Sequence, residues 1–300
     1  PSTDYKGLAF ISSGESTVRL AQVGTPYEIS LEYSTDESHW KPYTIGETIT
    51  LADSTFLLFR NGEHKNRKFS KDDENYYHFE ISGPISAQGN IMSLLNRDFS
   101  TPPTFYGFFA LFEGCTSLLS APELPAEALA TNCYRYMFRG CSALTSAPEL
   151  PATKMEAYCY NSMFANCTGL TSAPELTAKR LESNCYQHMF EGCTSLSSAP
   201  ELPATYLVTE CYHSMFNGCT SLTSAPKLPA MTLEWGCYSE MFQGCTSLTS
   251  APELPAKELI RNCYQLMFKD CSKLRYVKAL FTTGPSEETT KDWLSGVAAS

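Results

Sequence analysis

The stretch CTSLTSAPELPA, residues 245–256, decides the fold because close copies of it return at a fixed interval along the chain. Cysteines mark that interval: Cys115 and Cys141 are 26 residues apart, and every later member of the series keeps the same step. The first series is Cys115, Cys141, Cys167, Cys193, Cys219, Cys245 and Cys271. The second is Cys133, Cys159, Cys185, Cys211, Cys237 and Cys263. A repeat of this length predicts a solenoid, in which stacked units share one core that no single unit could bury alone.

Incomplete units flank the array on both sides. Phe108, Leu111, Phe112 and Gly114 hold the places of Tyr, Met, Phe and Gly one unit before the first complete copy. At the other end, Trp293, Leu294 and Gly296 fall at the Met, Phe and Gly places. Terminal units of a solenoid are atypical because they must cover its core. We therefore expect residues 91–300 to form the solenoid together with both capping half-repeats.

Apolar places in the second half of each unit are separated by steps of three and four. In one unit they are Leu129, Cys133, Tyr134, Met137 and Phe138. This spacing is typical of one face of a helix. Gly140, or Asn or Asp in other units, follows, and these residues tolerate the left-handed conformation that ends helices. The pattern predicts a short helix on the convex side of each coil.

The first half of each unit should be extended. Leu118, Ala121 and Leu124 are its inward candidates, and copies would stack about 4.8 Å apart in a parallel sheet. Pro122 cannot donate a hydrogen bond to such a ladder, so the sheet should be narrow. The predicted fold class is therefore an α/β leucine-rich-repeat solenoid of 26-residue repeats, with a narrow parallel sheet and short convex-side helices.

A known family shares this pattern. The run MF-x-G-C-T-S-L-T-S-A-P-E-L-P resembles the AF-x-x-C-x-x-L-x-x-I-x-I-P signature of BspA-like leucine-rich-repeat surface proteins of Bacteroides-type bacteria. The resemblance covers about Phe105 to Gly296, although the unit is longer than usual for the family and its strand reads Ala-Pro-Glu-Leu. It implies a secreted or cell-surface protein that binds or adheres to an extracellular protein or glycan.

Residues 1–90 lack the repeat. Short β-rich runs recur there at Leu8–Ile11, Val18–Val23, Tyr27–Tyr33, Ile49–Leu51, Phe56–Phe59 and Tyr77–Ile81. Turn residues such as Asn61-Gly62 separate them. Several short strands at this spacing predict an antiparallel, sandwich-like β domain in front of the solenoid.

The thirteen cysteines allow three interpretations. Neighbouring copies would lie within disulfide range, but stacked copies point their side chains in parallel. A metal site is disfavoured because no CxxC occurs and no histidine accompanies the cysteines. We favour buried, reduced thiols that fill a narrow core, and we expect neither a metal nor a cofactor.

Two surfaces are candidate binding sites. One is a column of carboxylates at one place of successive units: Glu123, Glu149, Glu175, Glu201 and Glu253, with Lys227 between the last two. Such a column should face water, where it either keeps the protein soluble or attracts a basic partner or cation. The other is the set of variable helix places, where Tyr158, Tyr206 and Trp235 stand out because exposed aromatics often anchor partners. Drift on an unselected surface would give the same variation.

The overall charge of −10 disfavours nucleic acid, whose phosphates require a basic patch. No apolar run approaches the about 20 residues of a membrane helix. The chain opens at Pro1 without a start Met, so either a leader has been removed or the sequence is a trimmed piece of a longer protein. Together with the family resemblance, we expect a secreted or cell-surface protein whose leader or anchor has been removed.

Three functions compete at this point. The first is a non-catalytic module that binds a protein or glycan through the solenoid. The second is a structural spacer that presents another domain away from the cell. The third is an enzyme with its site in the front domain, near His39, Trp40 and Tyr43. No catalytic motif is present, so we expect no enzyme.

Overall fold

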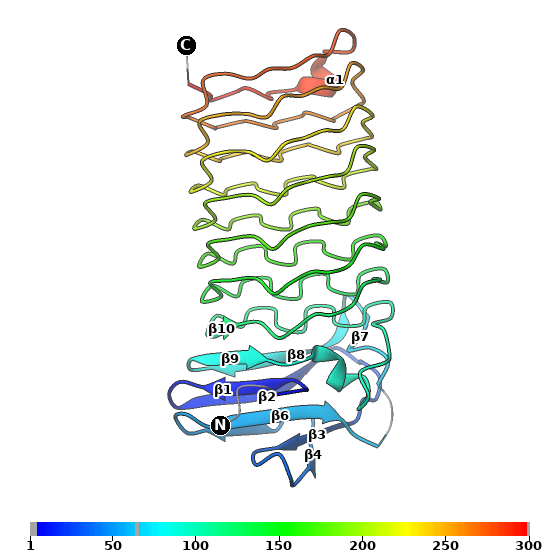
Figure 1. Ribbon diagram of the computed structural model, residues 1–300, viewed down its shortest axis with the longest axis vertical. Coiled ribbons are helices and arrows are strands. Elements are labelled where there is room, and N and C mark those ends of the chain that lie inside the picture. Colours follow the sequence, from blue (N-terminus) through cyan, green and yellow to red (C-terminus); the bar gives the residue numbers. More distant parts are fainter. Residues whose placement is uncertain (1–4, 64–65, 299–300) are drawn as a thin grey trace.

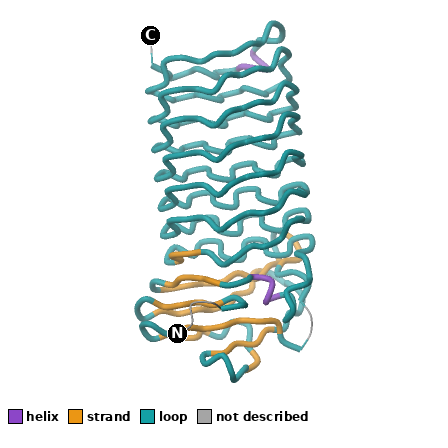
Figure 2. Tube along the Cα trace, viewed as in Figure 1, coloured by secondary structure: helices purple, strands orange, loops and turns teal. Residues whose placement is uncertain are grey.

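Strands occupy the first third of the chain and stacked coils the remainder, in a computed structural model that describes residues 5–63 and 66–298 (Figure 1). The strands are β1 (Ala9–Ser12), β2 (Ser16–Val23), β3 (Leu31–Ser34), β4 (Lys41–Pro42), β5 (Thr48–Leu51), β6 (Phe56–Asn61), β7 (Ser70–Asp72), β8 (Asn75–Ser82), β9 (Ile85–Gln88) and β10 (Leu118–Ser120). A 3-10 helix, η1 (Ile91–Leu94), and a helix of one turn, α1 (Glu287–Thr290), are the helices of the described part (Figure 2). Neither is long or apolar enough to cross a membrane. We expect that a leader has been removed before Pro1, and Pro1 lies outside the described residues.

The strands of the front part form two sheets that face each other. One has the order β10-β9-β1-β6-β3-β4 and the other β5-β2-β8-β7. Side chains alternate along the strands, so that Val18 and Leu20 of β2 are fully buried between the sheets. Phe10 of β1 meets Phe79 of β8 there, edge to face, with ring centroids 5.0 Å apart. The core of the front part therefore lies between the two sheets.

Both sheets continue directly into the first coil. β9 pairs with β10 in parallel, with Leu118 opposite Ile85. On the other side, the Phe79 N–H donates to the Leu111 carbonyl and the Phe69 N–H to the Gly107 carbonyl, each at 2.7 Å. One hydrophobic cluster runs from Leu8 to Leu274 without interruption. The front part thus covers the end of the stack, and the domain boundary at residues 90 and 91 stays a prediction.

The helices expected in the repeats are absent from the described residues, so this prediction is wrong. Backbone N–H groups alternate between two kinds of acceptor: Gln187 donates back to the Asn184 carbonyl at 3.3 Å, whereas His188 donates to the His213 carbonyl of the next coil at 2.9 Å. In an α-helix every N–H would donate four residues back within its own segment. The segment is therefore a row of tight turns that bonds to its neighbour at every second residue.

A left-handed residue stands at every fourth position of this row. In one coil these residues are Asn184, His188 and Gly192, with φ of 60°, 56° and 69°. Left-handed backbone is unfavourable for residues other than glycine. It persists here because it lets alternate N–H groups turn towards the next coil. The Asn and Gly places that suggested the end of a helix belong to this pattern.

The predicted narrow parallel sheet is also wrong. Between coils of the described residues the serine places make only isolated parallel bridges, such as Ser146 with Ser172 and Ser172 with Ser198. Prolines follow these places in every complete unit and have no N–H to extend a ladder. The repeats are thus stacked coils of turns and extended segments (Figure 2), not an α/β arrangement.

Two ladders of aromatic rings fill the stack. Phenylalanines stack from Phe112 to Phe268 with ring centroids 5.4–5.8 Å apart, and tyrosines from Tyr134 to Tyr264 at 5.8–6.0 Å. Phe79 of β8 lies against the first phenylalanine, and Trp293 lies against the last tyrosine. The ladders are therefore capped by the front sheets and by the divergent last unit.

All thirteen cysteines are free and buried, as the repeat predicted. Thiols of the first series donate to the carbonyl of a phenylalanine in the preceding coil, as Cys193 does to Phe164 at 3.1 Å. Burial raises the pKa of Cys167 to about 12, so its thiol stays protonated. Each of these cysteines fills a small apolar place and also satisfies a carbonyl.

Removing one ring should destabilise the stack locally. Phe190 is fully buried between Phe164 and Phe216, so Phe190→Ala should cost about 3–5 kcal/mol. Because coils couple mainly to their neighbours, hydrogen exchange should accelerate in that coil and the adjacent ones first. Equal acceleration throughout the front sheets would contradict local coupling.

The two cysteine series should respond differently to serine. Cys193→Ser leaves a hydroxyl that can donate to the Phe164 carbonyl, whereas the thiol of Cys185 donates to no acceptor among the described residues. A buried hydroxyl without a partner costs about 1–3 kcal/mol. Cys185→Ser should therefore lower the free energy of unfolding more than Cys193→Ser, as measured by urea denaturation. Equal losses would show that the thiol-to-carbonyl hydrogen bond contributes nothing.

Candidate functional site

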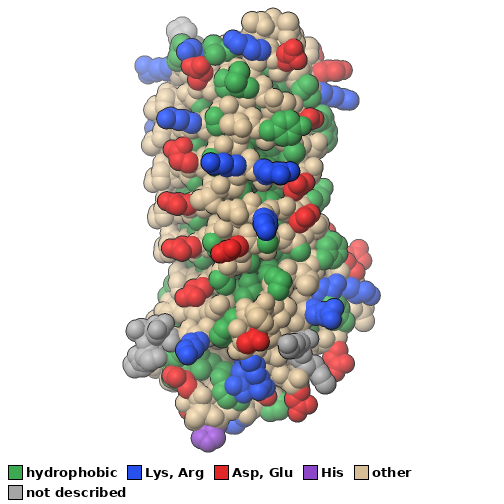
Figure 3. Space-filling view, turned by 45° about the vertical axis from the view of Figure 1, so that its right-hand side comes forward, with side chains coloured by type: hydrophobic (Ala, Val, Ile, Leu, Met, Phe, Trp, Pro, Cys, Tyr) green, Lys and Arg blue, Asp and Glu red, His purple; other side chains and the backbone are tan. Residues whose placement is uncertain are grey.

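Acidic side chains form a column along one face of the stack (Figure 3). The five predicted carboxylates, Glu123, Glu149, Glu175, Glu201 and Glu253, are all exposed. Lys227 interrupts the column, and Lys278 of the last coil pairs with Glu253 at 2.6 Å. No basic residue interrupts the column between Glu123 and Glu201. This part of the column is therefore more strongly negative than the part with Lys227 and Glu253.

Shallow hollows walled by prolines lie beside the carboxylates. One, of about 510 Å³, lies between Pro122–Pro125 and Pro148–Pro151 of consecutive coils. Others of about 410 and 270 Å³ repeat it farther along, with Pro174 and Pro226 in their walls. Because proline is rigid and donates no hydrogen bond, these hollows offer a partner apolar walls beside an exposed carboxylate.

Four large apolar side chains are exposed on three consecutive coils, and we call them the corner cluster: Tyr206, Met231, Trp235 and Ile260. Their exposed fractions are 57%, 63%, 42% and 40%. They come from three consecutive coils, and backbone contacts join those coils: Tyr206 bridges Thr232, and the Glu210 N–H donates to the Trp235 carbonyl. The corner cluster therefore extends along the stack on neighbouring coils.

Two members of the corner cluster were singled out from the sequence and two were not. Tyr206 and Trp235 lie on adjacent coils, as a shared binding surface requires. Tyr158, the third aromatic candidate, lies in an earlier coil and outside the corner cluster. Its side chain is half-buried, and the Arg135 guanidinium lies 5.4 Å from its ring centroid. Met231 and Ile260 were missed, although each stands at a place that is polar or alanine in most other units.

Polar side chains connect neighbouring coils on the face made of tight turns. Asn184 donates to Glu210 at 2.8 Å, and the rings of His188 and His213 meet edge to face with centroids 5.1 Å apart. Burial lowers the pKa of His213, and the nearby His188 lowers it further, against the opposing charges of Glu240, Glu210 and Glu191. The pair forms no metal site with other groups, because the described residues contain no cluster of three or more potential ligands.

The front-domain residues considered for catalysis do not form one site. His39 Nδ1 lies 2.7 Å from Asp36 Oδ2 and 3.0 Å from Ser38 Oγ, all within one exposed loop. A catalytic triad needs the carboxylate and the serine on different ring nitrogens. Tyr43 is buried elsewhere, where its hydroxyl accepts from the Leu20 N–H at 2.9 Å. The loop geometry therefore offers no activated nucleophile.

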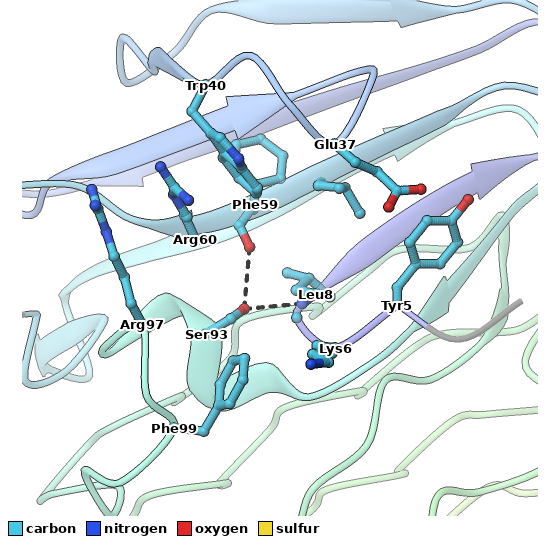
Figure 4. A pocket seen from close by; sticks show the side chains of 12 residues that line it. Tyr5, Lys6, Leu8, Glu37, Trp40, Phe59, Arg60, Ser93, Arg97 and Phe99 are labelled. Carbon is cyan, nitrogen blue, oxygen red and sulfur yellow. Dashed lines mark hydrogen bonds between the residues drawn. The ribbon is translucent and has the colours of Figure 1, made fainter. Parts of the chain in front are cut away.

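Trp40, the third of these residues, lines a cavity of about 340 Å³ that we call the front pocket (Figure 4). The walls come from four places: the segment before β1, the loop between β3 and β4, the second half of β6, and η1 with the segment after it. Ser93 of η1 fixes the floor, since its hydroxyl donates to the Phe59 carbonyl at 3.1 Å and accepts from the Leu8 N–H at 2.9 Å. The hydroxyl thus acts both as donor and as acceptor within the protein, and it holds η1 against β6 and the segment before β1.

Comparison with known proteins gives one match. The family model described as BspA type Leucine rich repeat region, in 6 copies, matches residues 109–223 and 179–283. These ranges include the acidic column and the corner cluster and exclude the front pocket. No curated protein and no solved structure matches the chain.

Stability should fall in mild acid because of His213. Its pKa in the folded protein lies below the ordinary value of 6.5, so on acidification the unfolded chain takes up a proton first. The contribution is present above about pH 6.5 and is lost as the pH falls through the folded pKa. His213→Gln should therefore lose less free energy of unfolding between pH 7.5 and 5.5 than the unmodified protein.

Urea denaturation at the two pH values measures this difference. His39→Gln is the matched control, because that imidazole is 82% exposed in the front part and its contact with the half-exposed Asp36 is screened by water. It should keep the acid sensitivity of the unmodified protein. If His213→Gln keeps it as well, the half-buried histidine pair is not its source.

Proposed function

Because the chain belongs to the BspA-type leucine-rich repeat family, we propose that it is a non-catalytic binding module that engages an extracellular protein through its stacked coils. The protein would be secreted or held at the cell surface. The observation that carries this proposal is the corner cluster, where four large apolar side chains are exposed on consecutive coils. Exposed apolar patches on a protein surface commonly mark interaction sites.

The backbone of the stack supports this assignment. Hydrogen bonds between coils hold the segments that carry Tyr206 and Trp235, so the two aromatics are presented without further ordering. Pre-organised aromatic side chains lower the entropic cost of binding. The acidic column adds charge that would steer a basic region of the partner towards the stack.

A spacer function is the second candidate, and the unbroken core favours it. The cluster from Leu8 to Leu274 and the hydrogen bonds between coils would hold the two ends of the stack at a fixed distance from each other. Removing one whole unit, residues 193–218, should preserve spacer function apart from length. A binding module would lose part of its cluster, because Tyr206 lies in that unit.

Binding can be tested with arrays of purified extracellular matrix proteins and immobilised glycans, probed with the labelled full chain. For a protein target that binds, Tyr206→Ser and Trp235→Ser should each weaken affinity by at least about tenfold, because an aromatic anchor commonly contributes more than about 1.4 kcal/mol. Phe105→Ser is the matched control, since Phe105 is 48% exposed but lies outside the corner cluster.

The control should bind as tightly as the unmodified chain. Full affinity in the Tyr206→Ser, Trp235→Ser double variant would rule out the corner cluster as the binding surface. Absence of any target in the arrays would favour the spacer function, and binding to glycans alone would replace the protein partner with a carbohydrate.

A further inference from the structure

The front pocket has a cationic side built from two arginines. Arg60 Nη2 lies 2.7 Å and Arg97 Nη2 3.0 Å from the same oxygen of Glu32, which leaves one carboxylate between two guanidinium groups. Arg60 is also held over the Trp40 ring, with its guanidinium carbon 3.8 Å from the centroid. Because a guanidinium has five N–H donors, both side chains retain donors for a further anion.

The opposite side of the pocket carries hydroxyl and carboxylate groups. Figure 4 shows the Tyr5 hydroxyl and the Glu37 carboxylate across the cavity from Arg60 and Arg97. Tyr5 is only 7% exposed, and its hydroxyl has no hydrogen-bond partner among the described residues. That oxygen is closed to solvent, so Tyr5 shapes the pocket wall with its ring and does not contact a ligand. Glu37 is exposed, and its carboxylate is the polar group on this side that a ligand can reach.

Apolar side chains make up much of the remaining lining, beside Lys6 and Ser93. Trp40 and Phe99 line the pocket from different segments, and Leu8 and Leu58 lie between them. Glu37 and Phe99 both have left-handed backbone, with φ of 68° and 60°. Such conformations in residues other than glycine are unfavourable, and they concentrate at ligand sites. Two residues of this kind, from different segments, are among those that line the cavity, which is consistent with a binding role.

We propose that the front pocket binds a sugar acid, a pyranose ring that carries one carboxylate. The carboxylate would accept from Arg60 and Arg97, and ring hydroxyls would donate to the Glu37 carboxylate on the other side. Trp40 and Phe99 would pack against the C–H groups of the ring. A cavity of about 340 Å³ has room for one such residue with bound water. The site is separate from the corner cluster, so either proposal can fail without the other.

Three probes of similar size separate the contributions to binding. Glucuronate carries the carboxylate and the hydroxyls, glucose lacks the carboxylate, and cyclohexanecarboxylate lacks the hydroxyls. Titration calorimetry or saturation-transfer NMR on the full chain at low ionic strength should show binding of glucuronate. Glucose and cyclohexanecarboxylate should each bind at least about tenfold more weakly, because each loses hydrogen bonds to charged groups.

Variants then locate the binding. Arg97→Ala should weaken glucuronate binding by at least about tenfold, since Arg97 is half-exposed and its loss should be tolerated by the fold. Glu37→Ala removes the acceptor of the ring hydroxyls and should weaken binding of glucuronate but not of cyclohexanecarboxylate. Lys41→Ala is the matched control, because Lys41 is an exposed cation of β4 outside the pocket.

Equal binding of glucuronate and glucose would overturn the assignment of the arginines. Equal binding of glucuronate and cyclohexanecarboxylate would overturn the sugar, leaving a general carboxylate site. The proposal also fails if glucuronate does not bind at millimolar concentration, or if Lys41→Ala weakens it as much as Arg97→Ala. Unchanged thermal unfolding of each variant, measured alongside, excludes misfolding as the cause of a loss.

Discussion

The hydrogen bonds between coils are the constraint on which the rest of the structure depends. In each row of tight turns, every second N–H donates to the coil that follows, so no coil can satisfy its own backbone. A neighbour with the same backbone in the same register is the partner that fits. This requirement accounts for the constant unit length, for the left-handed residue at every fourth place and for the alignment of the aromatic rings.

A stack built this way needs two ends of a different kind. At the first end, Phe69 and Phe79 of the front sheets contribute both the backbone donors and the rings that an earlier coil would supply. At the other end, Trp293 covers the last tyrosine. The front part is therefore a structural cap, and its outward side is free of the repeat. The front pocket lies in this part of the chain, where side chains from separate segments converge.

Stacking also separates the places that must stay constant from those that can vary. Core places repeat because each ring or thiol meets an identical neighbour. The corner places contribute little to stacking, so Tyr206, Trp235 and Ile260 can stand where other units have charged or small residues. Carboxylates stacked at one place repel each other, and they are tolerated because water surrounds all of them. His213 shows the opposite case, since burial makes its charged form unfavourable.

The repeat itself was determined by the sequence: the unit length, the buried places, the free thiols and the family all follow from residues that recur at one interval. Tyr206 and Trp235 could be singled out in the same way, because an exposed aromatic at a variable place is visible without a structure. The conformation of the turn rows could not be predicted. Over eight residues, a row of four-residue turns and a helix put Cys185, Tyr186, Met189 and Phe190 on the same side.

What distinguishes the two is where the N–H groups find acceptors, and only the position of the next coil decides that. The same holds for the front pocket. Its walls come from residues near 5, 37, 60 and 97, which have no common spacing and meet only when β1, β6 and the segment after η1 pack together. Periodicity reports what one segment repeats, whereas hydrogen-bond acceptors and cavities depend on what lies beside it.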